Sequence, residues 1–140
     1  MMEKIKIISI SIIICSILFL SGCQDNTAVD VLFENINFDS DILKLINGSF
    51  NPTRGNDGEI IEVEVIFYLE NIAGQPIKNL SLSIDFCDEQ DNIIYHHPYK
   101  YGSPFPEGYR EHSPNRMSYK GRNVEFIDHV NIEIANYQLI

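Results

Sequence analysis

Positive charge is scarce in this chain. Its 140 residues include 10 lysines and arginines against 20 aspartates and glutamates, which gives a formal net charge of −10. Proteins that bind nucleic acid neutralise phosphates with lysine and arginine, so this balance argues against a nucleic-acid partner. Anionic lipid headgroups would repel the same acidic surface, so charge alone would not hold the protein at a membrane.

The sequence also lacks the short motifs on which enzyme sites are commonly built. It contains no Gly-x-Ser-x-Gly elbow, no phosphate-binding loop, no dinucleotide fingerprint, and no Cys-x-x-Cys or His-Glu-x-x-His spacing. Glu62 and Glu64 lie two residues apart, but alternating acids are typical of a solvated strand face. We therefore expect a protein that is not an enzyme, with no cofactor and no resident metal.

Helical periodicity is absent as well, since no eleven-residue window carries a convincing helical pattern. Apolar and polar residues alternate instead, most clearly over residues 59–71 and 80–87. This alternation, rich in β-branched and aromatic residues, predicts strands with one buried face, and hence an all-β, antiparallel two-sheet sandwich. Further strands are expected at 42–46, 93–95, 124–127 and 130–139, with turns or loops at 47–48, 52–58, 73–76 and 88–92.

The N-terminus has a different character. A short basic head precedes an almost unbroken apolar stretch at residues 7–20, and Leu20-Ser21-Gly22-Cys23 follows. This order describes a secretory signal peptide, because the apolar stretch is too short to span a bilayer comfortably and small residues precede Cys23. The ending resembles the lipobox of bacterial lipoproteins. That resemblance implies cleavage after residue 22 and attachment of lipid to the thiol of Cys23.

These features divide the chain into three parts. We expect residues 1–22 to be a lipoprotein signal peptide, residues 23–30 a lipidated cysteine with a short polar tether, and residues 31–140 a single domain. Lipid on Cys23 would make the membrane a partner and would place the domain outside the cytoplasm, on the cell membrane or the outer membrane. Each buried methylene contributes about 0.8 kcal/mol, so the two or three chains typical of bacterial lipoproteins make attachment effectively permanent.

The cysteines fit an extracytoplasmic chain that has no disulfide framework. Cys15 leaves with the signal peptide and Cys23 carries lipid, so Cys87 is the single thiol of the mature chain. No intrachain disulfide is then possible, and stability has to come from the hydrophobic core. Cys87 falls on the strand face opposite the apolar stripe, where we expect it to be a small residue buried beneath a loop.

A second resemblance concerns the domain. A strand, an Asn-x-x-Gly-x-Pro turn at residues 71–76 and a strand that ends in an acidic turn are similar to the FxLYD-type domains of bacterial cell-envelope lipoproteins. The run Ile84-Asp85-Phe86-Cys87-Asp88 corresponds to their signature; only the acidic residue matches by identity, while the apolar alternation is kept. The resemblance implies an immunoglobulin-like β-sandwich of about seven strands. It implies no activity, because those domains share no common catalytic site.

Residues 95–122 differ in composition from the rest of the domain. They hold five of the seven tyrosines, and five basic residues against Glu107 and Glu111. Aromatic area beside planar cationic donors is typical of binding surfaces, and long loops are often functional. We therefore predict that this segment is a loop that binds an envelope or extracellular protein. The predicted contact residues are Tyr99, Tyr101, Tyr109, Arg110, Arg116 and Tyr119.

Two other interpretations of these residues stay open. In the first, the basic side chains of residues 95–122 pair with the acidic body while the tyrosines cap a sheet edge. In the second, His96 and His112 bind a small ligand or a divalent metal ion together with nearby carboxylates. Neighbouring strand residues such as His96 and His97 point to opposite faces, which weakens the metal hypothesis. Asp88, Asp91 and Asn92 are interpreted as a hairpin turn rather than a calcium loop.

Overall fold

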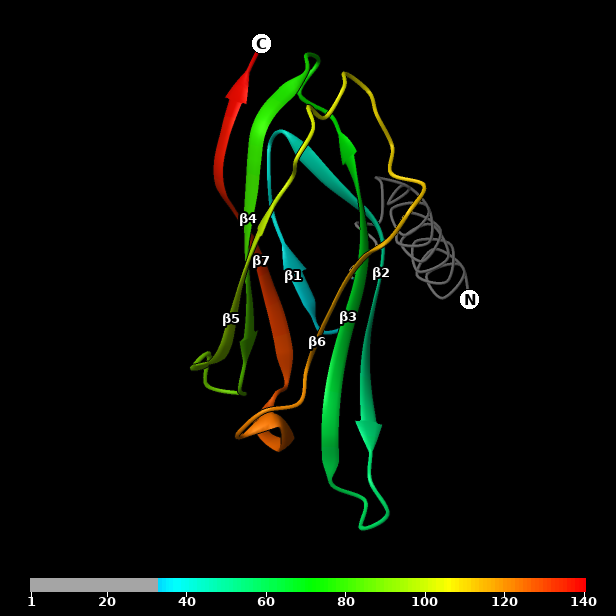
Figure 1. The fold of residues 1–140 in the computed structure, drawn as a ribbon, viewed down its shortest axis with the longest axis vertical. Coiled ribbons are helices and arrows are strands. Elements are labelled where there is room, and N and C mark those ends of the chain that lie inside the picture. The colour runs from blue at the N-terminus through cyan, green and yellow to red at the C-terminus, as the bar shows by residue number, and fades with distance from the viewer. Residues whose placement is uncertain (1–32) are drawn as a thin grey trace, which may run out of the picture. The chain divides into compact units, whose positions relative to one another are not determined.

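The computed structural model describes residues 33–140, so the expected signal peptide, Cys23 and the tether lie outside the described residues. Within these residues the chain forms two β-sheets, with strand orders β1-β7-β4-β5 and β2-β3-β6 (Figure 1). The predicted all-β sandwich is confirmed. Its elements are β1 (Ile36–Phe38), β2 (Leu43–Arg54), β3 (Ile60–Asn71), β4 (Ile77–Cys87), β5 (Ile93–Lys100), β6 (Asn115–Tyr119), the short 3₁₀ helix η1 (Val124–Phe126) and β7 (His129–Leu139).

The pairing of the strands gives the sandwich two distinct ends. All pairs are antiparallel except β1 and β7, which run parallel with Ile36 opposite Val130. The chain therefore enters the sandwich beside the start of β7, and β7 runs from there to the opposite end. We call residues 33–35, 55–59, 88–92 and 123–128 the entry end. We call residues 39–42, 72–76, 101–111 and 137–140 the distal end.

The core lies between the two sheets and follows the predicted alternation. Burying one such side chain contributes about 1.5–3 kcal/mol, so the facing rows of β3 and β4 account for much of the domain's stability. The alternation over residues 59–71 also places Ile61 on the buried face of β3, but its side chain is 51% exposed because it lies next to the open β2–β3 turn. The residues of the two rows, each at most 1% exposed, are Val63, Val65, Phe67, Leu69, Leu80, Leu82, Ile84 and Phe86.

Asn47 and Gly48 do not form the predicted turn. β2 continues through them, with a register shift between Leu45 and Asn47. A Cβ on Gly48 would lie 3.0 Å from Cδ1 of Ile36 and 3.6 Å from the ring of Phe33. The glycine thus permits the close approach of β1 rather than a change of direction. Because β2 extends to Arg54, the predicted loop at 52–58 is also wrong in its first residues.

Residues 124–126 form η1 and not the predicted strand. Val124 and Ile127 are both buried, at 6% and 4% exposure, and stand three positions apart. A 3₁₀ helix has three residues per turn, so this spacing places both side chains on one face, whereas a strand would separate them. No helix among residues 33–140 is long and apolar enough to cross a membrane.

Candidate functional site

The segment at residues 95–122 is not the single long loop that its composition suggested. β5 takes up its first part and β6 its last, which leaves residues 101–114 as the connection from one sheet to the other. This connection is itself held by backbone hydrogen bonds. Phe105 exchanges two with Ile77, at 2.7 and 2.9 Å, and the carbonyl of Tyr109 accepts one from Asn71 at 2.9 Å. Most of the segment is therefore paired backbone.

A buried polar network fixes the middle of the connection. The Glu111 side chain accepts hydrogen bonds from the backbone N–H of Leu69 and from Nδ2 of Asn115, both at 2.7 Å, and from the hydroxyl of Tyr101 at 3.0 Å. Glu111 is 9% exposed, and burial raises the pKa of its carboxyl although these hydrogen bonds act in the opposite direction. Burial likewise raises the pKa of Tyr101 far above its ordinary value. Tyr101 is thus a packing residue, and sequence reasoning missed the structural role of Glu111.

The aromatic side chains of the connection pack mainly on one another. The rings of Tyr99, Tyr101, Phe105 and Tyr109 form successive edge-to-face contacts, with centroid distances of 5.0, 5.4 and 5.1 Å. Phe105 is buried and Tyr99 and Tyr101 are half-buried, so they extend the hydrophobic core. Tyr109 ends the series and is 39% exposed. Of these predicted contact residues, only Tyr109 presents its ring to solvent.

Tyr119 joins the edges of the two sheets. Its ring stacks on Tyr95 of β5, with a centroid distance of 4.5 Å and an interplanar angle of 14°. Its hydroxyl donates to the carbonyl of Arg122 at 3.0 Å, and a Cβ on Gly121 would lie within 2.3 Å of the hydroxyl oxygen. This geometry supports the interpretation that tyrosines cap a sheet edge, as far as Tyr119 is concerned.

Two basic residues of the segment pair with the acidic body. Arg116 Nη1 lies 3.1 Å from Glu64 Oε2, and Lys120 Nζ lies 3.5 Å from Glu62 Oε2. Exposed pairs of this kind contribute about 0–1 kcal/mol, so they neutralise charge more than they stabilise the fold. Arg110 lies opposite Glu70 beside β3, and its side chain is exposed.

The structure does not bring His96 and His112 together. His96 is on β5, where Nδ1 lies 2.5 Å from Asp85 Oδ1, whereas His112 follows Glu111 beside the other sheet and contacts the ring of Tyr109. Ser83 Oγ lies 3.4 Å from the same Nδ1 of His96. A catalytic triad needs the hydroxyl and the carboxylate on different ring nitrogens, so this trio does not form one. Within residues 33–140 no three His, Cys, Asp or Glu side chains are grouped as a metal site requires.

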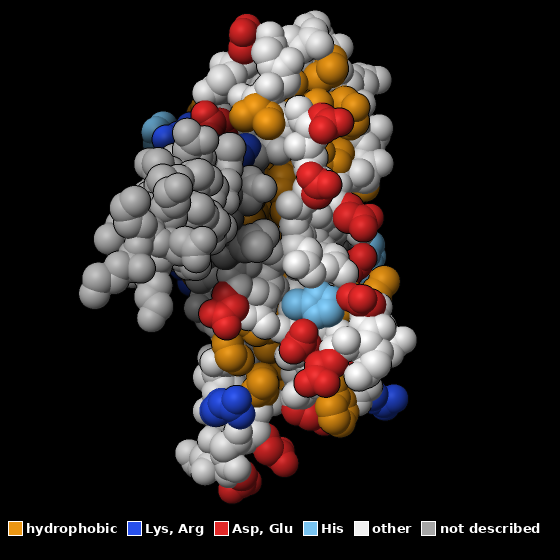
Figure 2. All heavy atoms as spheres, turned by 180° about the vertical axis from the view of Figure 1, so that it is seen from behind, with side chains coloured by type: hydrophobic (Ala, Val, Ile, Leu, Met, Phe, Trp, Pro, Cys, Tyr) orange, Lys and Arg blue, Asp and Glu red, His pale blue; other side chains and the backbone are white. Residues whose placement is uncertain are grey.

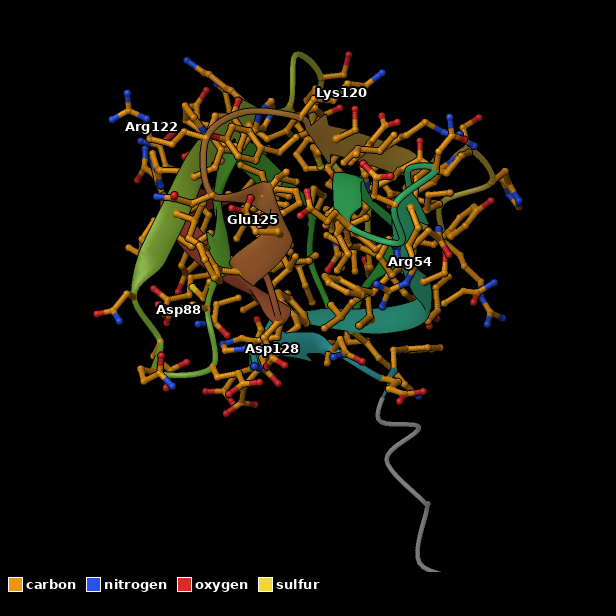
Figure 3. The ribbon with its side chains drawn as sticks, turned by 90° about the horizontal axis from the view of Figure 1, so that it is seen from below. Arg54, Asp88, Lys120, Arg122, Glu125 and Asp128 are labelled. Carbon is orange, nitrogen blue, oxygen red and sulfur yellow. The ribbon has the colours of Figure 1, made fainter. Side chains whose placement is uncertain are left out.

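At the entry end, residues 88–92 form the predicted turn. Both Asp88 oxygens accept hydrogen bonds within it, from the Asn92 side chain and from the backbone N–H groups of Gln90 and Asn92, and these bonds lower the pKa of Asp88. The predicted burial of Cys87 is confirmed at 1% exposure. Burial and the nearby aspartates raise its pKa to about 11, which keeps the thiol protonated. Figure 3 shows Asp88 and Asp128 on the side of this end away from Lys120 and Arg122.

Exposed apolar side chains gather at the distal end. Eight large hydrophobic residues among residues 33–140 are exposed, and five of them form what we call the distal patch: Ile72, Tyr109, Tyr137, Leu139 and Ile140. Backbone pairing unites their segments, because Ile77 lies between Phe105 and Leu139 and Pro76 accepts from the N–H of Ile140. On the face in Figure 2, several hydrophobic side chains lie close together at the upper end, among acidic ones, and others lie lower on the same face. The patch was missed because it draws on three separate segments.

The structure thus divides the six predicted contact residues. Tyr99, Tyr101 and Tyr119 support packing and Arg116 pairs with Glu64, while Tyr109 and Arg110 stand exposed side by side in sequence at the distal end. No protein-family model matches the chain, and no curated protein or solved structure is significantly similar to it.

Proposed function

We propose that this protein is a non-catalytic, membrane-anchored lipoprotein that binds or positions an envelope or extracellular protein through its distal end. The lipobox-like ending at Cys23 supports the anchor, and the resemblance to FxLYD-type domains supports a place among cell-envelope lipoproteins. The observation that carries the binding role is the distal patch, which holds five of the eight large hydrophobic side chains that are exposed in the described domain. Apolar residues concentrated in this way are typical of interaction sites.

The distal patch is far from the residues at which the described chain enters the sandwich. The chain enters beside Val130, whose N–H donates to the carbonyl of Asn35 at 2.9 Å, and β7 then runs for 11 residues. At about 3.3 Å per residue, the two ends of β7 lie about 35 Å apart. The distal patch therefore lies at the opposite end of β7 from the residues at which the described chain begins.

Tyr109 and Arg110 have the properties of interface residues. Aromatic residues and arginine are enriched where protein interfaces are most fully buried. The Tyr109 ring is already held edge-on by Phe105, and the Tyr109 backbone is bonded to Asn71. Because the ring is ordered before binding, contact with a partner costs little additional side-chain entropy.

Site-specific photo-crosslinking in cells tests this proposal. A photoreactive phenylalanine analogue replaces Tyr109 in one version of the full chain and Phe126 in another, because both are exposed aromatic residues at opposite ends of the sandwich. We expect a discrete crosslinked product from position 109 and none from position 126. A further change of Leu139 and Ile140 to Ser should reduce the product from position 109. Equal crosslinking from both positions, or none from position 109, would contradict the proposal.

A further inference from the structure

The imidazole of His129 lies between two carboxylates at the entry end. Its Nδ1 is 2.9 Å from Asp128 Oδ2, and its Nε2 is 2.7 Å from Asp91 Oδ1. Asp91 belongs to the turn between β4 and β5, whereas Asp128 belongs to the connection between η1 and β7. The His129 side chain is 12% exposed, so the ring is an internal link between two separate segments and not a free surface group.

The two contacts require a doubly protonated ring. A neutral imidazole carries one N–H, and its other nitrogen is an acceptor. Ionised carboxylates are acceptors only, so a neutral His129 would direct a lone pair at Asp91 or at Asp128. The imidazolium donates to both at once. The geometry therefore depends on one proton.

The groups around His129 stabilise the doubly protonated form of its ring. Asp91 and Asp88 face it from the turn, Cys87 lies opposite it on β4, and Asp128 precedes it on its own segment. The thiol of Cys87 stays protonated, and Asn35, which bonds the Asp128 carbonyl from the β1 side, is uncharged. Burial lowers the pKa of His129, but the hydrogen bonds and charges of Asp128 and Asp91 outweigh it and raise the pKa above its ordinary value.

We propose that His129 is a proton-dependent clasp that ties the β4–β5 turn to the start of β7 when charged and releases the turn when neutral. Release is local, because other bonds hold the neighbouring backbone. Asp128 N–H still donates to the carbonyl of Cys87 at 2.8 Å, and Val130 N–H to that of Asn35. The clasp therefore makes the mobility of residues 88–92 depend on pH while the sandwich stays folded.

The sign of the effect follows from the raised pKa. The closed state binds the proton more tightly than the open state, so the clasp is fully effective below the ordinary histidine pKa of about 6.5. It is lost as the pH rises through the higher pKa of the closed state. Between the two values, the equilibrium constant for opening increases by up to about tenfold per pH unit, and it levels off on either side.

Hydrogen–deuterium exchange of the full chain tests the clasp. Peptides that cover residues 88–92 are compared between the wild type and His129→Gln at matched pH values from about 5.5 to 9, so that the intrinsic pH dependence of exchange cancels. We expect residues 88–92 of the variant to exchange faster than those of the wild type at the acidic end, and the difference to vanish as the pH rises. His112→Gln is the control and should match the wild type. The proposal would be overturned if the ratio of the exchange rates of His129→Gln and the wild type at residues 88–92 were independent of pH, or equal to one at every pH.

A direct titration of His129 keeps the proposal testable if His129→Gln folds poorly. Imidazole resonances of the full chain are followed with pH in the wild type and in Asp91→Asn, which alters an exposed turn residue. We expect His129 to titrate above about 6.5 in the wild type and at lower pH in Asp91→Asn, because one carboxylate partner is lost. A wild-type value at or below 6.5, or no change in Asp91→Asn, would refute it.

Discussion

Three buried polar residues determine the path of the chain between β5 and β6. They are Asn71, Glu111 and Asn115, each at most 9% exposed. Asn71 shares its side-chain N–H groups among the carbonyls of Gln75, Phe105 and Pro106, at 2.8 to 3.0 Å, and its Oδ1 accepts from Ala73. Among residues 33–140 no buried side-chain nitrogen or oxygen lacks a partner. Because an unpaired buried group is costly, these side chains specify one conformation of an irregular segment.

Glu111 offers the sharpest test at this scale. Glu111→Ala removes the acceptor of the Leu69 N–H and one of the two acceptors of Asn115 Nδ2, which keeps only the Phe67 carbonyl at 3.3 Å. The change should lower the free energy of unfolding by about 2–4 kcal/mol. Glu111→Gln should cost less than about 1 kcal/mol, because the Gln oxygen can accept from Leu69 while its amide donates to the Tyr101 hydroxyl, which already lies 3.1 Å from Asn115 Oδ1. Urea unfolding of the full chain, followed by circular dichroism, gives both values. If both variants lost the same free energy of unfolding, Glu111 would not stabilise the fold by accepting these hydrogen bonds.

The wild type and Glu111→Gln together test a prediction about the pH dependence of stability. The pKa of Glu111 is raised in the folded state, so the folded chain binds this proton more tightly than the unfolded chain. Its contribution to stability is present below the unfolded pKa and is lost as the pH rises through the folded one. In Glu111→Gln this component should disappear, so the stability difference between the two proteins should change across that window and be constant outside it.

At the scale of elements, sequence patterns succeeded where one face of a strand is buried and one is solvated. β3 and β4 each meet this condition, so alternation alone located them and their core rows. The same patterns did not predict strands that form only because they pair with a segment distant in sequence. β6 is short and is defined by pairing with β3, with Met117 opposite Val65, and nothing local distinguishes it from a loop. The distal patch could not be predicted for the same reason, since its residues meet only after folding.

Gly48 shows how a local signal can mislead. Asn-Gly is a strong turn dipeptide, yet here the missing side chain makes room for Ile36 and Phe33. We expect Gly48→Val to push β1 away from β2 and to lower the free energy of unfolding by about 1–3 kcal/mol.

Gly102→Val is the matched control for this change. A Cβ on Gly102 meets nothing within 4 Å, and Gly102 does not have a positive φ, so its substitution should stay within about 0.5 kcal/mol. Thermal unfolding of the two full-length variants compares the sites. If Gly48→Val proves as mild as Gly102→Val, the contact with β1 is not tight.

At the scale of the whole molecule, the proposed anchor at Cys23 precedes the described domain in the chain, and its chemistry can be tested separately from the binding surface. Cys23→Ala should abolish incorporation of labelled fatty acid, because the predicted lipid-bearing thiol is removed. Cys87→Ser is the control and should label like the wild type, since Cys87 is buried and protonated in the folded domain. Continued labelling of Cys23→Ala would refute the anchor.

The parallel pairing of β1 with β7 has a mechanical consequence. Tension applied between Phe33 and Ile140 would pull the two strands past each other along their length, because the chain enters at the start of β1 and leaves at the far end of β7. The register Ile36–Val130, Asn37–Asn131, Phe38–Ile132 would then carry the load in shear, with its hydrogen bonds strained together instead of parting one at a time. The side-chain bond from Asn37 to Asn131, at 2.8 Å, lies in the same row. A domain held at one end and pulled at the other would resist extension at this short strand first.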